Sequence, residues 1–403
     1  MGVGASGAYR FTSLLSFTVY DIAAHPDGGV IIVGNVLWDP AGTPSREGAI
    51  AHIDDDGSVV WSLRTEWAGN EQFFSVLVDE PNTYAVGLTR RGSGMGNNDE
   101  ILVSRFSLDG IYSGSLVFGD PASDEHAWDA IRTSDNGMLI SGFTTQSGFG
   151  NRDAALYKLD ATLQPDWSIA IGGRQEDLFR GASEDNDGGF VAVGKRGQSP
   201  NTSDNLVAKV DADGDLVYNY NFGDGSAADV MRGIAMLDQG RYLVVGETGS
   251  SGAGSLHGYF GVFEPAGDPI VSLSTVGGAG YGVFRNLLPL GGSQFLAFGQ
   301  IGSASMTDGP WIASVDTSGD ITLDWHLAYE ADADQRSFGG GGAIRTDGGL
   351  AIAMHDVQGT NDATFEPAVL YIDSLGGLDD DCPPHPRRLR SAGLGARQPG
   401  HDH

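Results

Sequence analysis

The stretch Glu184–Arg196, EDNDGGFVAVGKR, joins an acidic segment, a Gly-Gly pair and an apolar run in that order. Aspartate in such a segment bonds its own backbone and glycine supplies positive φ, so the first half predicts a hairpin turn. The apolar run that follows is typical of a buried strand. Similar sequence segments occur at four more places: HPDGGVIIVGN from His25, TSDNGMLISGF from Thr133, LDQGRYLVVGE from Leu237 and TDGGLAIAMHD from Thr346.

This hairpin recurs at a nearly constant period. The residue that ends each apolar run recurs every 52 to 55 residues, and the series is Gly34, Gly87, Gly142, Gly194, Gly246, Gly299 and Met354. A second repeated segment lies downstream of each, for example ALYKLD in the third copy and LVAKVD in the fourth. Seven copies of both marks indicate one repeat architecture rather than several independent domains.

Each copy is expected to contain four strands, as in HAWDAIRT, GMLISGFT, ALYKLD and PDWSIAIGG of the third copy. A four-stranded sheet has two faces to bury and two edges to hide, and a radial arrangement of such sheets solves both problems. The repeat therefore predicts an all-β fold, a seven-bladed β-propeller with four-stranded antiparallel blades over residues 1–378.

The two ends of the chain complete this prediction. The seventh copy lacks its last strand, whereas the N-terminus holds a spare apolar segment, so we expect Ala8–Leu15 to close the ring by pairing with Val369–Asp373. Residues 379–403 are rich in Pro, Arg and Asp with almost no apolar content, and they predict a disordered tail. Outer-strand aromatics at Trp61, Trp167, Tyr218 and Trp325 are expected to pack between neighbouring blades.

Blade three, residues 124–173, resembles the repeat unit of bacterial β-propeller repeat proteins. Their units of about 53 residues run roughly as DxxxSxxxTxDGGYxxxGxT, then GxxDxxLxKLD, then GxxxW and a closing GG. The resemblance covers about residues 8–378, and blades two and six depart from it because they lack DGG. It implies a scaffold in a secreted or surface-exposed setting.

Composition limits the partners. A net charge of −30 disfavours nucleic acid and anionic membranes, and no apolar run approaches the length of a membrane span. The one cysteine, Cys382, lies in the expected tail, so no intrachain disulfide can form. No leader is visible at the N-terminus, which leaves a cytoplasmic location as the alternative to a secreted one. We expect a monomer.

No linear catalytic motif is present: neither HExxH, GxSxG, a Walker loop nor CxxC occurs. The acidic turns at Glu184–Gly189 and Asp211–Asp215 resemble calcium loops, but a hairpin explains them without metal, and we expect no cofactor. Two functions remain: a non-catalytic binding propeller that engages a protein or glycan with one face, or a glycan-cleaving enzyme, a polysaccharide lyase or hydrolase.

The candidate site follows from the first strand of each copy. Residues at the expected channel mouth are acidic or neutral in the first three blades, including Asp21 and Asp129 next to Trp128, and cationic in the next three. We predict that Arg180, Arg232 and Arg285 bind an anionic group, such as a carboxylate or sulfate of a glycan, because guanidinium groups suit planar oxyanions. The alternative is that these arginines pair with neighbouring aspartates or channel water as internal structure.

Overall fold

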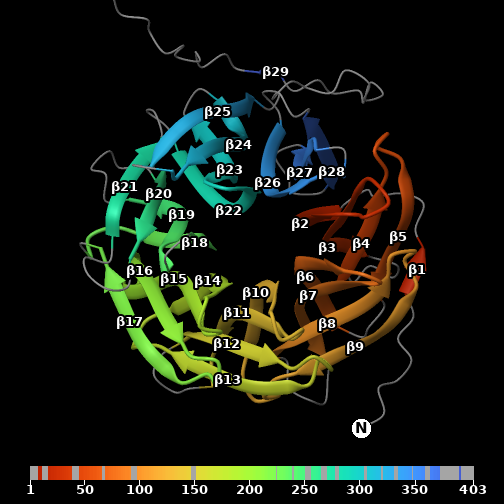
Figure 1. The fold of residues 1–403 in the computed structure, drawn as a ribbon. Coiled ribbons are helices and arrows are strands. Elements are labelled where there is room, and N and C mark those ends of the chain that lie inside the picture. The colour runs from red at the N-terminus through yellow and green to blue at the C-terminus, as the bar shows by residue number, and fades with distance from the viewer. Residues whose placement is uncertain are drawn as a thin grey trace, which may run out of the picture.

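The computed structural model describes residues 8–10, 17–38, 45–65, 69–91, 98–146, 151–223, 225–237, 240–249, 256–264, 270–276, 281–303, 306–318, 321–330, 335–346, 348–358, 364–372 and 390–391. Within these ranges the chain is all β, and its sheets are arranged radially around a central axis, as a β-propeller (Figure 1). No helix among them is long and apolar enough to cross a membrane.

Six sheets contain a complete set of four blade strands, and each is built from consecutive antiparallel strands. Blade one has β2 (Phe17–Ala24), β3 (Val30–Trp38), β4 (Ser45–Ile53) and β5 (Val59–Thr65). Blade two has β6 (Gly69–Asp79), β7 (Asn82–Arg91), β8 (Asp99–Ser107) and β9 (Tyr112–Phe118). Blade three has β10 (Glu125–Arg132), β11 (Met138–Thr144), β12 (Asp153–Leu159) and β13 (Pro165–Ile171).

The remaining sheets continue around the ring. Blade four has β14 (Asp177–Glu184), β15 (Phe190–Ser199), β16 (Thr202–Val210) and β17 (Leu216–Phe222). Blade five has β18 (Asp229–Met236), β19 (Tyr242–Thr248), β20 (His257–Phe263) and β21 (Ile270–Val276). Blade six has β22 (Tyr281–Gly291), β23 (Gln294–Ser303), β24 (Met306–Asp316) and β25 (Thr322–Glu330). The last sheet has β26 (Gln335–Ile344), β27 (Leu350–Gln358) and β28 (Thr364–Ile372).

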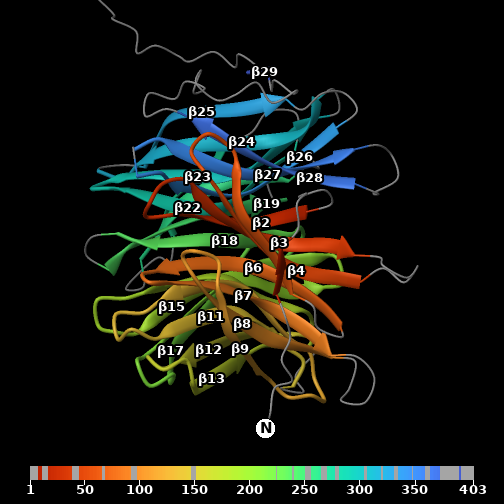
Figure 2. The same ribbon diagram turned by 90° about the vertical axis from the view of Figure 1, so that its right-hand side faces the viewer.

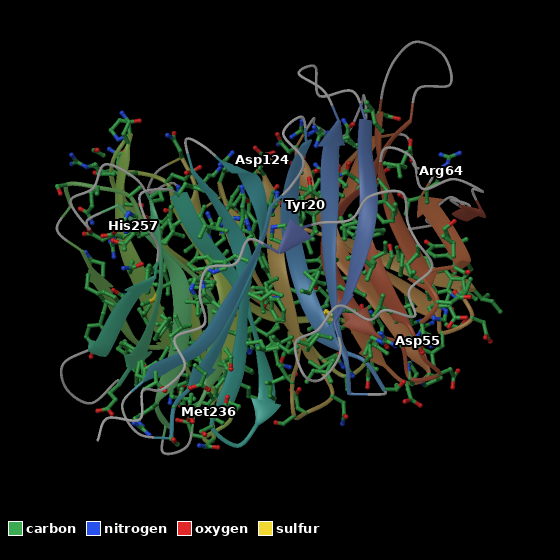
Figure 3. The ribbon with its side chains drawn as sticks, turned by 90° about the horizontal axis from the view of Figure 1, so that it is seen from above. Tyr20, Asp55, Arg64, Asp124, Met236 and His257 are labelled. Carbon is green, nitrogen blue, oxygen red and sulfur yellow. The ribbon has the colours of Figure 1, made fainter. Side chains whose placement is uncertain are left out.

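The first strand of every sheet is innermost and the last is outermost (Figure 1), and Figure 2 shows the same sheets from the side. The innermost strands begin on one face of the disc, here called the upper face, and end on the other, the lower face. Figure 3 views the disc edge-on, with Asp124 and His257 towards the upper face and Asp55 and Met236 towards the lower face.

The prediction of seven four-stranded blades closed by the N-terminal strand is wrong. Six sheets have four blade strands, whereas the last sheet has three, and β28 pairs only with β27 among the described residues. The N-terminal strand β1 (Ala8–Arg10) pairs instead with the outermost strand of blade one, Ala8 opposite Thr65 and Arg10 opposite Leu63. Residues 11–15 of the predicted closing strand lie outside the described ranges.

The physical reason is that two outer edges were available. Both β5 and β28 present an unpaired edge that an apolar segment can cover, and the sequence pattern of Ala8–Leu15 does not distinguish them. The ring closes through side chains, because Ala343 and Ala353 of the last sheet share a core cluster with Phe17 and Val19 of blade one. The predicted tail, residues 379–403, lies outside the described residues except for β29 (Arg390–Ser391), which pairs with Tyr329–Glu330.

Repeated turns and aromatics lie where the sequence predicts them. In the hairpin between β14 and β15, Gly188 N–H donates to the Asp185 carbonyl at 3.0 Å, and Lys209 Nζ lies 2.5 Å from Asp185 and 2.6 Å from Asp187. Trp61 Nε1 donates to Leu108 O of the next blade at 3.1 Å, and Trp167 Nε1 donates likewise to Ala212 O at 3.0 Å. These two tryptophans therefore pack between neighbouring blades, as expected.

Candidate functional site

A cavity of about 230 Å³ lies among the innermost strands in the central channel, and its lining includes every residue that the sequence singles out as a ligand contact. Its lining includes, besides Phe74, Gly233 and Asn286, the predicted set Asp21, Trp128, Asp129, Arg180, Arg232 and Arg285. These residues come from the innermost strands of five blades, so only the closed ring brings them together.

Every innermost strand carries a β-bulge at the same place, and the bulged residue enters the channel. The ladder to the second strand skips one residue in each sheet, namely Tyr20, Phe74, Trp128, Arg180, Arg232, Arg285 and Gly340. A bulge inserts one extra residue and re-aims its side chain, which explains why large side chains point into so narrow a space.

These bulges correct the predicted ring by one residue. The structural equivalents of the three arginines are Tyr20, Phe74 and Trp128, whereas Asp21 and Asp129 belong to the next position along the strand. Ser75, Gly181, Gly233 and Asn286 share that next position. The site thus has two layers: a bulge layer that is aromatic in three blades and cationic in three, and an adjacent layer that carries the two aspartates.

The arginines differ in their partners. Arg232 donates from Nη2 to Glu247 Oε1 at 2.6 Å, and Arg285 donates from Nη2 to Gln300 Oε1 at 3.3 Å. Both acceptors directly follow the repeat glycine of their blade, but in blade four that position holds Lys195. Arg180 therefore lacks the acceptor that its neighbours have.

Arg180 is held by stacking instead. Its Cζ atom lies 3.9 Å from the ring centroid of Trp128 in the preceding blade, a cation–π geometry. Its Nε is buried and has no hydrogen-bond acceptor among the described residues. Stacking on Trp128 fixes the plane of the guanidinium group.

The arginines repel one another. Burial, followed by the charges of Arg232 and Arg285, lowers the pKa of Arg180 to about 9. Burial and Arg232 also lower the pKa of Arg285. An anion in the cavity would relieve this repulsion, so the electrostatics of the empty site favour an anionic ligand.

The two aspartates join neighbouring blades rather than the arginines. Asp21 Oδ2 accepts the Val76 N–H of blade two at 2.9 Å, and Asp129 Oδ1 accepts the Ser75 hydroxyl at 3.4 Å. Burial raises the pKa of Asp21 to about 6, and burial together with the nearby Asp21 raises that of Asp129 to about 7. At neutral pH Asp21 is therefore mostly ionised, whereas Asp129 is about half ionised.

An aromatic arc completes the bulge layer. Tyr20 and Phe74 have ring centroids 4.8 Å apart, and Phe74 and Trp128 have theirs 5.0 Å apart. His126 packs on Trp128 at 4.1 Å, and burial with the charge of Arg180 lowers its pKa to about 3, so it stays neutral. The ring at the channel mouth is therefore half aromatic and half cationic.

Sequence reasoning missed Tyr20 and Phe74 as members of the site, and it missed the acceptors Glu247 and Gln300. A constant count back from the repeat glycine would have found the first two, because the bulged residue precedes it by 14 positions in most blades and by 13 in blade two. The described residues contain no group of three or more His, Cys, Asp or Glu side chains placed to hold a metal ion.

Comparisons with known proteins give structural resemblances at low identity. No protein-family model matches the chain, and no curated protein matches it. One similar solved structure is a protein of unknown function from Dyadobacter fermentans, with 10% identity, TM-score 0.48 and coverage of 90% of this chain and 96% of that one. Another, YCF48 bound to a D1 peptide, has 12% identity, TM-score 0.45 and coverage of 80% and 85%.

A third similar structure is a polysaccharide lyase, an ulvan lyase bound to a glucuronate and sulfated rhamnose ligand. It has 10% identity, TM-score 0.42 and coverage of 74% of this chain and 91% of that chain. None of these resemblances identifies a function for this chain.

Proposed function

We propose that this chain is a non-catalytic binding propeller that recognises the anionic group of an acidic glycan in its central channel. The observation that carries the proposal is Arg180: a guanidinium group stacked on Trp128 at 3.9 Å, with a buried Nε that has no acceptor among the described residues. Carboxylates and sulfates match the fork of N–H groups that such an arginine offers. A location outside the cytoplasm is part of this proposal.

Charge supports an anion rather than a cation. Below about pH 6, where Asp21 and Asp129 are largely protonated, three guanidinium groups share the one carboxylate of Glu247. Positive charge gathered in this way is unusual in a chain of net charge −30, whose surface would otherwise repel anions.

Size and chemistry support a glycan. A cavity of about 230 Å³ has the volume of several water molecules at about 30 Å³ each, so it accommodates a small charged group rather than a folded partner. Phe74 and Trp128 line the same cavity as the three arginines. Sugar acids combine an apolar C–H face with a carboxylate and suit both halves of the ring.

The experiment is to measure binding of galacturonate and of a sulfated monosaccharide by calorimetry, for the native chain and for Arg180→Gln. Loss of a charge-assisted hydrogen-bond pair is expected to weaken binding by about tenfold or more. Arg105→Gln is the matched control, because Arg105 is an exposed arginine on β8 away from the channel. Equal affinity in native and Arg180→Gln protein, or no binding of either sugar, would overturn the proposal.

A glycan-cleaving enzyme is the second candidate, since two carboxyls with raised pKa values line the same cavity and could exchange protons near pH 6 to 7. The binding experiment separates the two. Each ligand, and an oligomer of it, is incubated with the protein and assayed for new reducing ends and for the ultraviolet absorbance of unsaturated products. Turnover that Asp129→Asn abolishes would favour the enzyme.

A further inference from the structure

A second, larger cavity lies on the upper face over blade four, and it has a rigid frame. Its volume is about 570 Å³. Two bridges between blades border it: Arg152 pairs with Glu176 across the blade three–four junction, and Ser203 pairs with Ala228 across the next. We call it the blade-four groove. Its walls belong to backbone that is paired on both sides, so its shape is largely preformed.

The lining of this groove is polar and hydroxyl- and amide-rich. The amide side chains of Asn151, Gln175 and Asn201 line it and make no hydrogen bond among the described residues. The hairpin between β15 and β16 adds Ser199 and Thr202, whose hydroxyls lie 2.8 Å apart. Free amides and hydroxyls in a preformed cleft suit a ligand that carries many hydroxyl groups.

Apolar walls are nearly absent, since the nonpolar side chains that line the groove are Pro200 and Ala228. A peptide that docks through apolar side chains would find no pocket for them. The polarity of the lining thus favours a sugar over such a peptide.

The groove also carries a charge suited to an acidic ligand. Glu176 bridges two cations, Arg152 and Lys195, and its Oε2 lies 2.5 Å from Lys195 Nζ. Burial alone would raise the pKa of Glu176, but its bonds to these cations lower it, so it is ionised at neutral pH. One positive charge remains unbalanced within this triad.

The groove adjoins the channel mouth through blade four. Lys195 follows Gly194, which lies opposite Phe179, the residue before Arg180. Glu176 is close enough to raise the pKa of Arg180, and Arg152 is close enough to lower that of His126. Because the groove residues Glu176 and Arg152 lie this close to Arg180 and His126, we expect one extended ligand to reach both cavities.

We infer that the blade-four groove binds the sugar units adjoining the acidic group held at the channel mouth, so that the ligand is an extended acidic oligosaccharide rather than a single sugar acid. This inference rests on the proposed function. It adds the substrate class, a uronate or sulfated chain of several units, and assigns its hydroxyl contacts to Asn151, Gln175 and Asn201.

The test is to compare the affinity of galacturonate with that of its α-1,4-linked trimer, by calorimetry at fixed salt. The native protein is expected to bind the trimer at least about tenfold more tightly, since each added hydrogen bond is worth up to about tenfold. Gln175→Ala and Asn201→Ala are expected to remove most of this gain and to leave galacturonate binding unchanged. Asn186→Ala, on an exposed turn of the lower face, is the matched control.

Three outcomes are informative. Equal affinity for monomer and trimer, or a gain that both groove variants retain, overturns the inference but leaves the anion site intact. Equal binding of triglutamate, which has a similar charge without hydroxyls, also overturns it, because charge alone would then explain the gain. If Arg180→Gln changes neither affinity, the acidic group is not held in the channel, and both the proposed function and this inference are overturned.

Discussion

Replacing Arg180 by Gln is expected to stabilise the protein without ligand while it weakens anion binding by about tenfold or more. Burial and two neighbouring arginines lower the pKa of Arg180 to about 9, well below that of a free arginine. At about 1.4 kcal/mol per unit, the charge destabilises the folded state by about 5 kcal/mol. Stacking on Trp128 offsets about 1–2 kcal/mol, and the lost side-chain packing offsets about 1 more. The expected net gain in the free energy of unfolding is about 2 kcal/mol.

The sign follows from the direction of the shift. The folded pKa lies below the unfolded one, so at pH 7 the group is charged in both states and the whole destabilisation is present. It starts to fade only above about pH 9, where the folded protein releases the proton first, and it is lost progressively as the pH rises towards the unfolded pKa. The comparison of native and variant protein therefore belongs at neutral pH.

The assay is denaturant unfolding in sodium chloride and in sodium sulfate for the native chain, Arg180→Gln and Arg105→Gln. Sulfate stabilises most proteins by exclusion from their surface, so all three gain stability. A specific site adds RT ln(1 + [L]/Kd), about 1.4 kcal/mol at ten times Kd, and only proteins that retain Arg180 gain it.

Two results would refute this reasoning. If Arg180→Gln lowers the free energy of unfolding in chloride, the arginine is a structural member of an internal network. If sulfate stabilises all three proteins equally, the guanidinium group binds no anion. Either result would leave the stacking on Trp128 as packing alone.

The remaining predictions concern pH and turn geometry. Sulfate affinity is expected to fall as the pH rises through about 6 and about 7, where Asp21 and Asp129 gain charge, and calorimetry of Asp129→Asn is expected to show a flatter profile. In chloride, the free energy of unfolding is expected to fall as the pH rises from about 4 to about 7. Over this range folded Asp21 and Asp129 keep protons that the unfolded chain has already lost. Gly188 and Gly214 have φ of +79° and +84°, but only at Gly214 would a Cβ meet a neighbour, 2.6 Å from Trp167. Gly188→Ala is expected to cost about 1 kcal/mol and Gly214→Ala about 2–4 kcal/mol in denaturant unfolding, and equal losses would contradict the packing.

The repeat predicts the propeller well because its signals are local. The hairpin at Asp185–Gly189 and the outer turns follow from the backbone preferences of Asp and Gly, and the buried strands follow from their apolar runs. Ring closure is not local. Whether Ala8–Arg10 covers the edge of β5 or of β28 depends on two similar edges, and pattern alone does not decide between them.

The candidate site, like the fold, was predicted correctly in part and incorrectly in part. All six predicted residues line one cavity, because equivalent positions of a closed ring converge on its axis. The predicted alignment within the ring was wrong, since it matched an apolar-then-polar pair in each blade and so set Asp129 level with Arg180. The ladder shows that Trp128 is the equivalent of Arg180 and that Asp129 is the equivalent of Gly181.

This one-residue difference changes what the site can recognise. In the predicted ring, acidic and cationic residues would share one layer, and the two aspartates could have neutralised the arginines directly. In the structure the bulges put Trp128 beside Arg180, at 3.9 Å, while Asp21 bonds a backbone N–H of the next blade. The arginines therefore share their layer with aromatic rings rather than with carboxylates. That separation leaves Arg180 stacked on Trp128 with no carboxylate in its layer, which is the arrangement that the proposed anion site requires.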